Sequence, residues 1–233
     1  MVINMKILAL ETSAKSVSCA VTEDGSVLAS AYQCTGLTHS RTLMPMVEDL
    51  LKNADLTLSG IDRIAIAAGP GSFTGLRIGI AAVKGLAWAA DKPCCAVSTL
   101  YAMAQNVRHI DGLIIGAMDA RRNQIYNALF EASRGVLTRL CDDRAIGLDE
   151  LCEQLKCDNR RKIVLGDGGL LCFDYLTSHG IDCTLAPAQL LYQNAIGVAF
   201  SAEHGEAIPA QELAPVYLRP AQAERLRAEK ESK

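Results

Sequence analysis

The hydrophobic positions in the first half of the chain follow two spacings, one typical of strands and one typical of helices. Short apolar runs alternate with longer segments in which apolar residues recur every three or four positions. The pattern predicts strands at residues 6–10, 17–22, 27–32, 63–68 and 94–97, and helices at residues 40–54, 76–89 and 100–107. Asp24-Gly25 predicts a tight hairpin between the second and third strands, because glycine adopts the positive φ that such a turn requires.

The second half of the chain repeats this order. It predicts a three-strand meander at residues 113–118, 124–130 and 136–141, a helix at 148–155, a strand at 162–165 and a helix at 170–178. An edge strand at 181–185 and a helix at 194–204 follow. We therefore predict an α/β protein with two lobes, residues 1–110 and residues 111–233 with a C-terminal tail. Each lobe is a mixed sheet with a β-meander flanked by helices, and a cleft lies between them.

Composition narrows the classes of function. Of 233 residues half are hydrophobic and 21% are charged, and the net charge is -3, so the chain offers no broad cationic surface for RNA. Nine cysteines include no Cys-x-x-Cys pair, which favours reduced thiols in the cytoplasm over a zinc site or disulfides. No apolar run reaches the length of a membrane span. The chain starts at Met1, and Met5 is an alternative start.

The duplicated order resembles the actin-like and ribonuclease H-like class, which includes sugar kinases and heat-shock ATPases. In that class the turn after the first strand of each lobe faces the cleft and holds phosphate and magnesium. Here those turns read Glu11-Thr12-Ser13 and Asp119-Ala120-Arg121. The first turn is compatible with that role, although Glu11 is equally explained as a solvated carboxylate at a strand end. The second turn carries Arg121 and Arg122, whose bulk obstructs a close approach of the backbone to phosphate.

Two glycine-rich segments are further candidates for contact with a nucleotide. Gly69–Gly79 opens a predicted helix, and Gly71, Ser72 and Thr74 could bind an anion there. The segment lacks the lysine of a Walker A loop. Its other reading is a tight turn, with Gly79 and Gly85 allowing close helix packing. Gly168 and Gly169 follow a predicted strand and could contact adenosine, or they could simply open the next helix.

Three motifs in order resemble the TsaB family, also called YeaZ. They are the segment at residues 69–79, Met118-Asp119-Ala120-Arg121-Arg122, and Pro215-Val216-Tyr217-Leu218-Arg219. The resemblance implies a non-catalytic subunit that supports its catalytic paralogue TsaD, together with the ATPase TsaE, in forming N6-threonylcarbamoyladenosine in tRNA. It also implies that tRNA is bound through the complex. We expect no cofactor for the isolated chain. Whether the assembled complex binds ATP or ADP stays open.

The metal site of the paralogue is expected to be absent. In the catalytic paralogue a helix carries two histidines four residues apart, which places both imidazoles on one face. Thr99 and Met103 occupy those places here, and neither is a competent ligand for a hard or borderline divalent ion. The chain also has no other histidine spacing typical of a metal pair. We therefore predict no catalytic residue and no metal ligand in this chain.

Two apolar helices of the first lobe are the candidate surface for a partner. Helical faces larger than the core requires are typical of interfaces, although burial inside the lobe explains many of the same residues. The candidates are Leu43, Val47, Leu50, Arg77, Ile78, Ala81 and Ala82. Homodimers through the same face are expected when the partner is absent. The alternative function is a stand-alone ATPase or kinase that uses Glu11 and Asp119 with magnesium, or a metallopeptidase.

Overall fold

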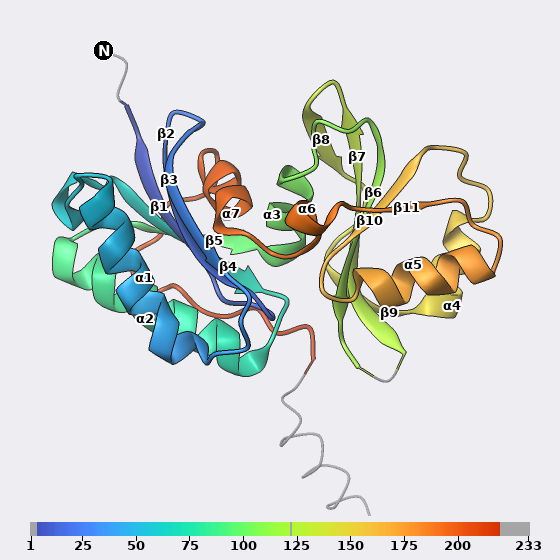
Figure 1. Ribbon diagram of the computed structural model, residues 1–233, viewed down its shortest axis with the longest axis horizontal. Helices are drawn as coiled ribbons and strands as arrows, with labels where there is room; N and C mark the ends of the chain where they lie inside the picture. Colours follow the sequence, from blue (N-terminus) through green and yellow to red (C-terminus); the bar gives the residue numbers. More distant parts are fainter. Residues whose placement is uncertain (1–3, 122, 220–233) are drawn as a thin grey trace, which may run out of the picture.

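The computed structural model describes residues 4–121 and 123–219, which form two lobes side by side (Figure 1). Arg122, the start ahead of Asn4 and the predicted tail beyond Arg219 lie outside the described residues. Each lobe is built on one mixed sheet with helices against it. The predicted duplicated α/β architecture is therefore confirmed.

The sheet of the first lobe has the order β3-β2-β1-β4-β5. Its meander is antiparallel, whereas β1, β4 and β5 run parallel to one another. The strands are β1 (Lys6–Glu11), β2 (Val17–Glu23), β3 (Ser26–Gln33), β4 (Arg63–Gly69) and β5 (Cys94–Ser98), and the helices are α1 (His39–Asn53), η1 (Leu58–Gly60), α2 (Phe73–Ala90) and α3 (Thr99–Gln105). The predicted hairpin is present, with φ of 47° at Asp24 and 76° at Gly25.

The sheet of the second lobe has the order β11-β10-β6-β7-β8, and β9 also pairs with β7. The predicted meander is present, and its turn holds Arg134 and Gly135 at positive φ. The elements are β6 (Gly112–Asp119), β7 (Gln124–Ser133), β8 (Val136–Arg139), β9 (Arg144–Gly147), α4 (Leu148–Leu155), β10 (Lys162–Leu165), α5 (Gly169–Ser178), β11 (Thr184–Leu185), α6 (Ala188–Leu191) and α7 (Ala195–Ala202). Strand β9 was not predicted, because its four residues carry too short a pattern.

Helix α2 begins earlier than the apolar spacing predicted. We expected a loop through Gly75, but the helix starts at Phe73 because the Ser72 hydroxyl accepts a hydrogen bond from the Gly75 N–H at 3.3 Å. A serine at this position satisfies a backbone donor that the first turn leaves unpaired. The glycine-rich segment is therefore partly the first turn of α2.

The last helix packs on the sheet of the first lobe, although the predicted boundary assigned residues 111–233 to the second. Val198 and Ala202 of α7 share a buried cluster with Ile7 and Ala20. The Ser18 hydroxyl oxygen accepts a hydrogen bond from the N–H of Ala195 at 2.9 Å. Helix α7 and the segment after it therefore return to the first lobe, and the second sheet is complete without them.

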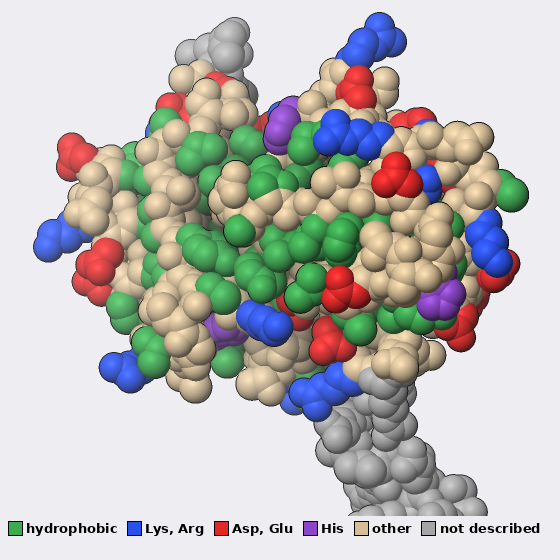
Figure 2. All heavy atoms as spheres, turned by 45° about the vertical axis from the view of Figure 1, so that its right-hand side comes forward, with side chains coloured by type: hydrophobic (Ala, Val, Ile, Leu, Met, Phe, Trp, Pro, Cys, Tyr) green, Lys and Arg blue, Asp and Glu red, His purple; other side chains and the backbone are tan. Residues whose placement is uncertain are grey.

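Helix α3 lies between the two sheets and contacts β4 and β5 of the first as well as β6 and β7 of the second. Helices α1 and α2 cover the opposite face of the first sheet, and α4 and α5 lie together against the second (Figure 1). On the face shown in Figure 2, hydrophobic side chains form a band across the middle and most charged side chains lie around its edge. Within the described ranges, no helix combines the length and apolarity that crossing a membrane requires.

Candidate functional site

A cleft of about 630 Å³ lies between the lobes. Its lining comes from the turn after β1, the start of α2, the turn after β6 and the segment Val216–Arg219, together with Tyr126 of β7 and Asp167 after β10. Parallel strands of both sheets end toward this cleft, which is where α/β proteins commonly bind ligands. The cleft is the expected site of the duplicated fold.

The turn after β1 is packed tightly against the start of α2. The Thr12 hydroxyl donates to the Gly75 carbonyl at 2.8 Å, and the Ser72 N–H donates to the Ser13 carbonyl at 2.6 Å. A Cβ on Gly75 would lie 2.1 Å from the Thr12 carbonyl oxygen. A side chain at position 75 would therefore push the two segments apart, which explains this glycine by packing without any ligand.

Glu11 is 1% exposed at the end of β1. Its Oε1 accepts a hydrogen bond from the Ser13 N–H at 2.5 Å, whereas Oε2 has no partner among the described residues. Burial raises the pKa of Glu11 from 4.5 to about 7, and the nearby Asp167 carboxyl adds to the rise. The reading of Glu11 as a solvated carboxylate is therefore wrong, since the side chain is buried next to the cleft and outside its lining.

The turn after β6 has the same local geometry in a different environment. Asp119 Oδ1 accepts a hydrogen bond from the Arg121 N–H at 2.7 Å, as Glu11 does from Ser13. Asp119 and Arg121 are exposed and line the cleft, and Arg121 has a φ of 64°. The arginine therefore occupies the backbone conformation that glycine favours.

Segment Val216–Arg219, which we call the strap, runs from the start of α2 to the turn after β6. The Val216 N–H donates to the Ala68 carbonyl at 2.7 Å, and the Tyr217 ring stacks on Phe73 with centroids 4.7 Å apart. The Arg77 Nε donates to the Tyr217 hydroxyl oxygen at 3.1 Å. At its other end, Arg219 donates to the Ala120 carbonyl at 3.2 Å and also contacts Gln124. The strap therefore fastens the start of α2 to the second lobe.

The structure places the nine candidate nucleotide contacts in two groups. Five of them line the cleft: Ser13, Gly71, Ser72, Thr74 and Asp119. Four do not: Glu11, Thr12, Gly168 and Gly169. A Cβ on Gly168 would lie 2.8 Å from the Asp119 nitrogen, so close packing against β6 accounts for this glycine. The lining hydroxyls and Lys15 fit a phosphate group, and Asp167 of the turn expected to contact adenosine also lines the cleft, although Gly168 and Gly169 do not.

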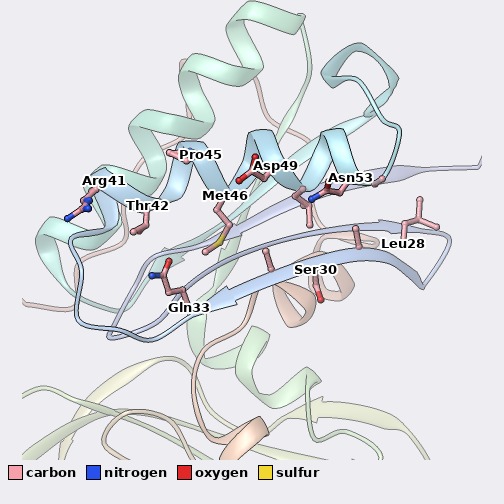
Figure 3. A pocket seen from close by; sticks show the side chains of 13 residues that line it. Leu28, Ser30, Gln33, Arg41, Thr42, Pro45, Met46, Asp49 and Asn53 are labelled. Carbon is pink, nitrogen blue, oxygen red and sulfur yellow. The ribbon is translucent and has the colours of Figure 1, made fainter.

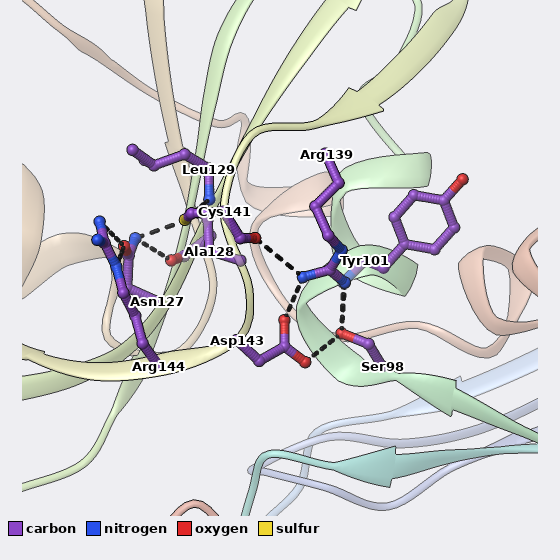
Figure 4. Close-up of polar contacts among 10 residues, drawn as sticks. Ser98, Tyr101, Asn127, Ala128, Leu129, Arg139, Cys141, Asp143 and Arg144 are labelled. Atoms are coloured by element: carbon purple, nitrogen blue, oxygen red, sulfur yellow. Dashed lines mark hydrogen bonds and ion pairs between the residues drawn. The ribbon is translucent and has the colours of Figure 1, made fainter.

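The start of α3 is occupied by a polar cluster that connects the lobes (Figure 4). The Ser98 hydroxyl donates to Asp143 Oδ2 at 2.6 Å and accepts from Arg139 Nη2 at 3.1 Å. Arg139 also pairs with Asp143 Oδ1 at 2.6 Å. Thr99 and Met103 on the same helix are 0% and 1% exposed, so both belong to the interior. Sequence spacing did not identify this cluster, because its members come from distant segments.

The candidate partner surface is only partly exposed. Leu43, Val47 and Leu50 are buried in the core, because α1 turns its apolar stripe toward the sheet. Ile78 and Ala82 are partly buried against the same core. Arg77 and Ala81 are exposed, as are Gly85 and Trp88 on the same side of α2. Trp88 is 82% exposed, and as the single tryptophan of the chain it was a signal that the sequence reasoning overlooked.

Residues 33–175 match the family model described as "TsaD: tRNA N6-adenosine threonylcarbamoyltransferase". The chain is 37% identical over 229 residues to the "tRNA threonylcarbamoyladenosine biosynthesis protein TsaB" of Bacillus subtilis, with 94% of this chain and 96% of that protein covered. It is 32% identical to the protein of the same name from Haemophilus influenzae, with 93% and 94% covered.

A solved structure supports the same relationship. The structure described as "YeaZ from Pseudomonas aeruginosa" superposes with a TM-score of 0.77 at 30% sequence identity. The match covers 92% of this chain and 100% of that chain. Fold and sequence therefore agree over nearly the whole length.

Proposed function

The chain belongs to the TsaB family, and from this premise we propose that it is the non-catalytic subunit that binds and supports a TsaD-type catalytic subunit in forming N6-threonylcarbamoyladenosine in tRNA. The observation that carries the proposal is similarity along almost the entire chain to proteins named for threonylcarbamoyladenosine biosynthesis. A stand-alone ATPase, kinase or metallopeptidase is not favoured by these similarities.

The interior of α3 supports a role without metal chemistry. Thr99 and Met103 stand where the catalytic paralogue is expected to carry its histidine pair, and both are buried. In residues 4–121 and 123–219, no group of three or more His, Cys, Asp or Glu side chains could hold a metal ion. The described side chains therefore supply no ligand set for metal-assisted catalysis.

The exposed side of α2 is the face that we assign to the catalytic partner. Ala81 and Gly85 have small side chains, and nothing lies within 4 Å of a Cβ built on Gly85, so a partner helix can approach closely. Trp88 at one end of this face supplies a large aromatic contact of the type that dominates binding energies. We further propose that the same face forms homodimers when the partner is absent.

The remaining proposals concern the location of the chain and its binding partners in the assembled complex. We propose that the chain works in the cytoplasm alongside the ATPase TsaE, and that tRNA is bound through the complex, since the net charge of -3 gives this chain little attraction for a polyanion. We propose that the hydroxyls lining the cleft bind a phosphate group of ATP or ADP when the chain is part of the assembled complex. The isolated chain is proposed to hold no cofactor.

Reconstitution tests this proposal. The chain is combined with its TsaD and TsaE counterparts, tRNA, ATP and the threonylcarbamoyl precursors, and modified adenosine is measured by mass spectrometry. We expect modification that requires this chain, and no modification or ATP turnover by the chain alone. Modification that proceeds equally without the chain, or sustained ATP hydrolysis by the chain alone, would contradict the proposal.

A pair of variants tests the partner face. Trp88→Glu places a charge on the α2 face, and we expect it to weaken binding to the TsaD-type subunit at least about tenfold. Val136→Glu is the matched control, because Val136 is 66% exposed on β8 of the other lobe. Equal binding by both variants, measured by calorimetry, would exclude the α2 face as the interface.

A further inference from the structure

A groove of about 580 Å³ lies between strand β3 and helix α1, and we call it the β3–α1 groove (Figure 3). Its walls are the exposed strand on one side and one side of α1 on the other. Ala29, Ala31, Met46 and Leu50 give it an apolar floor, and Arg41 and Asp49 stand on its helical rim. Helix α2 packs on β4 rather than β3, so this groove is separate from the α2 face assigned above.

Strand β3 has an open edge. It lies at the end of the first sheet and pairs only with β2 among the described residues. In an antiparallel pair, alternate residues direct their N–H and C=O groups toward the partner strand, so the other half of these groups on β3 points outward. The outer edge therefore presents a row of unpaired backbone donors and acceptors.

The other sheet edges are covered or short. Residue Ile208 pairs with Cys94 on the outer side of β5 through two backbone hydrogen bonds of 2.8 Å. In the second sheet, β8 has four residues and β11 has two. Strand β3 has eight. It is therefore the long edge that the described part of the fold leaves uncovered.

Beyond its first residues, strand β3 also lacks the usual protection against pairing. Exposed edges generally carry charged side chains, proline or a bulge. The sequence of β3, SVLASAYQ, contains no charge and no proline. A register shift opposite Val21 and Thr22 disturbs its first residues, but Ala29 to Gln33 pair regularly with β2. Five regular residues with small or uncharged side chains therefore remain available.

The dimensions of the groove fit an extended peptide. Five strand residues span about 17 Å, and the α1 wall from Arg41 to Asn53 is about 18 Å long at the usual helical rise. Small residues on the strand leave room for side chains of the occupant, and Met46 can adapt to different shapes. A strand added to an open edge beside a helix is a known mode of peptide recognition.

The rim charges define the chemistry of the occupant. Arg41 and Asp49 are exposed and lie eight residues apart on α1, about 12 Å along the helix axis. This separation equals roughly four residues of an extended strand. We propose that the β3–α1 groove binds an extended segment of a partner protein by adding it as a sixth strand beside β3. The segment carries an acidic and a basic side chain about four residues apart, with uncharged residues between them.

This proposal goes beyond the proposed function, because it assigns a second binding surface that does not involve the α2 face. Its test is a selection of random peptides displayed on phage against the full chain. We expect enrichment of sequences with an acidic and a basic residue about four positions apart and no proline between them. Failure to enrich any sequence, or enrichment that ignores both features, would overturn the proposal.

Variants then locate the binding of a selected synthetic peptide. Asp49→Lys should weaken it about fivefold, and exchange of the basic residue of the peptide for glutamate should restore affinity. Glu48→Lys is the matched control, because Glu48 is exposed on α1 but does not line the groove. Equal losses for both variants would show a general charge effect and refute the assignment.

Two further measurements distinguish strand addition from other modes. Two versions of the selected peptide carry N-methyl groups at alternate residues, one at the odd and one at the even positions. The version methylated on the groups that face β3 should bind with an affinity at least about tenfold lower, because it cannot donate those backbone hydrogens. Ser30→Lys places a charge on the exposed edge and should have a comparable effect. Sedimentation of the chain alone tests whether a second copy occupies the edge of β3. If the chain forms a dimer that Ser30→Lys abolishes, the occupant is the second copy and not a partner peptide.

Discussion

The turns after β1 and β6 occupy equivalent places in the two lobes and differ mainly in what covers them. In each, a carboxylate oxygen accepts a hydrogen bond from the N–H two residues later, at 2.5 Å for Glu11 and 2.7 Å for Asp119. Glu11 is buried, whereas Asp119 is exposed in the cleft. Both turns contribute residues to the cleft, but the carboxylate of the first is kept out of its lining and that of the second is part of it.

The difference arises from the segments that pack against each turn. Gly75 of α2 approaches Thr12 so closely that no side chain fits between them, while Ser13 of the same turn still lines the cleft. The second turn has a close contact to Gly168 on its inner side, but its outer side holds Arg121 and opens to the cleft. Duplication therefore preserved the backbone geometry, while the contacts around it determined the chemistry.

The largest expected effect comes from separating the first turn from α2. Gly75→Ala places a Cβ 2.1 Å from the Thr12 carbonyl oxygen, and we expect a loss of more than about 3 kcal/mol in the free energy of unfolding. Gly85→Ala on the same helix meets no atom within 4 Å and should stabilise by about 0.5–1 kcal/mol. Urea unfolding measures both, and similar values would contradict the packing explanation.

The second effect concerns the charge of Glu11. Its pKa rises from 4.5 to about 7 on folding, so the folded state binds more protons than the unfolded state between these values and stability falls as pH increases through them. Glu11→Gln removes this dependence and should stabilise the protein by about 2 kcal/mol at pH ~8, with little gain at pH ~4.

Asp119→Asn is the matched control for that measurement, because Asp119 is exposed in the equivalent turn. Thermal unfolding across the pH range reports both variants. If the pH profile of Glu11→Gln followed that of the unaltered chain, the buried carboxyl would not be the source of the dependence.

A smaller effect is expected at the strap, which fastens the start of α2 to the second lobe. Tyr217→Ala removes the stack on Phe73 and the hydrogen bond from Arg77, and it should lower the free energy of unfolding by about 1.5 kcal/mol. Tyr217→Phe keeps the ring and should cost only about 0.5 kcal/mol. Equal losses in chemical denaturation would mean that the hydroxyl, and not the stack, holds the strap.

The smallest effect is expected at Arg121. Its φ of 64° suits glycine, so Arg121→Gly should relieve the strained backbone and stabilise by up to about 1 kcal/mol. The variant also removes a cation from the cleft lining. A loss of stability in thermal unfolding would indicate that the arginine side chain makes contacts that outweigh the strain.

Local spacing predicted most of the fold because strands and helices bury side chains at different periods. The three-strand meanders and the longer helices of both lobes follow from runs and repeats within each segment, whereas the short helices η1 and α6 were not predicted. The start of α2 was misplaced, because the capping bond of Ser72 is a local contact that hydrophobic spacing does not report. Part of the candidate site was also predicted from the sequence, since Ser13, Gly71, Ser72, Thr74 and Asp119 line the cleft.

The sequence by itself determined the family, the order of elements and the absence of a histidine pair on α3, because these depend on residue types and their order. Only the tertiary structure decided that α7 returns to the first sheet, that Glu11 is buried, and that Leu43 belongs to the core while Trp88 does not. Periodicity indicates that a helix has an apolar face, but the surface covering that face comes from residues far away in the chain.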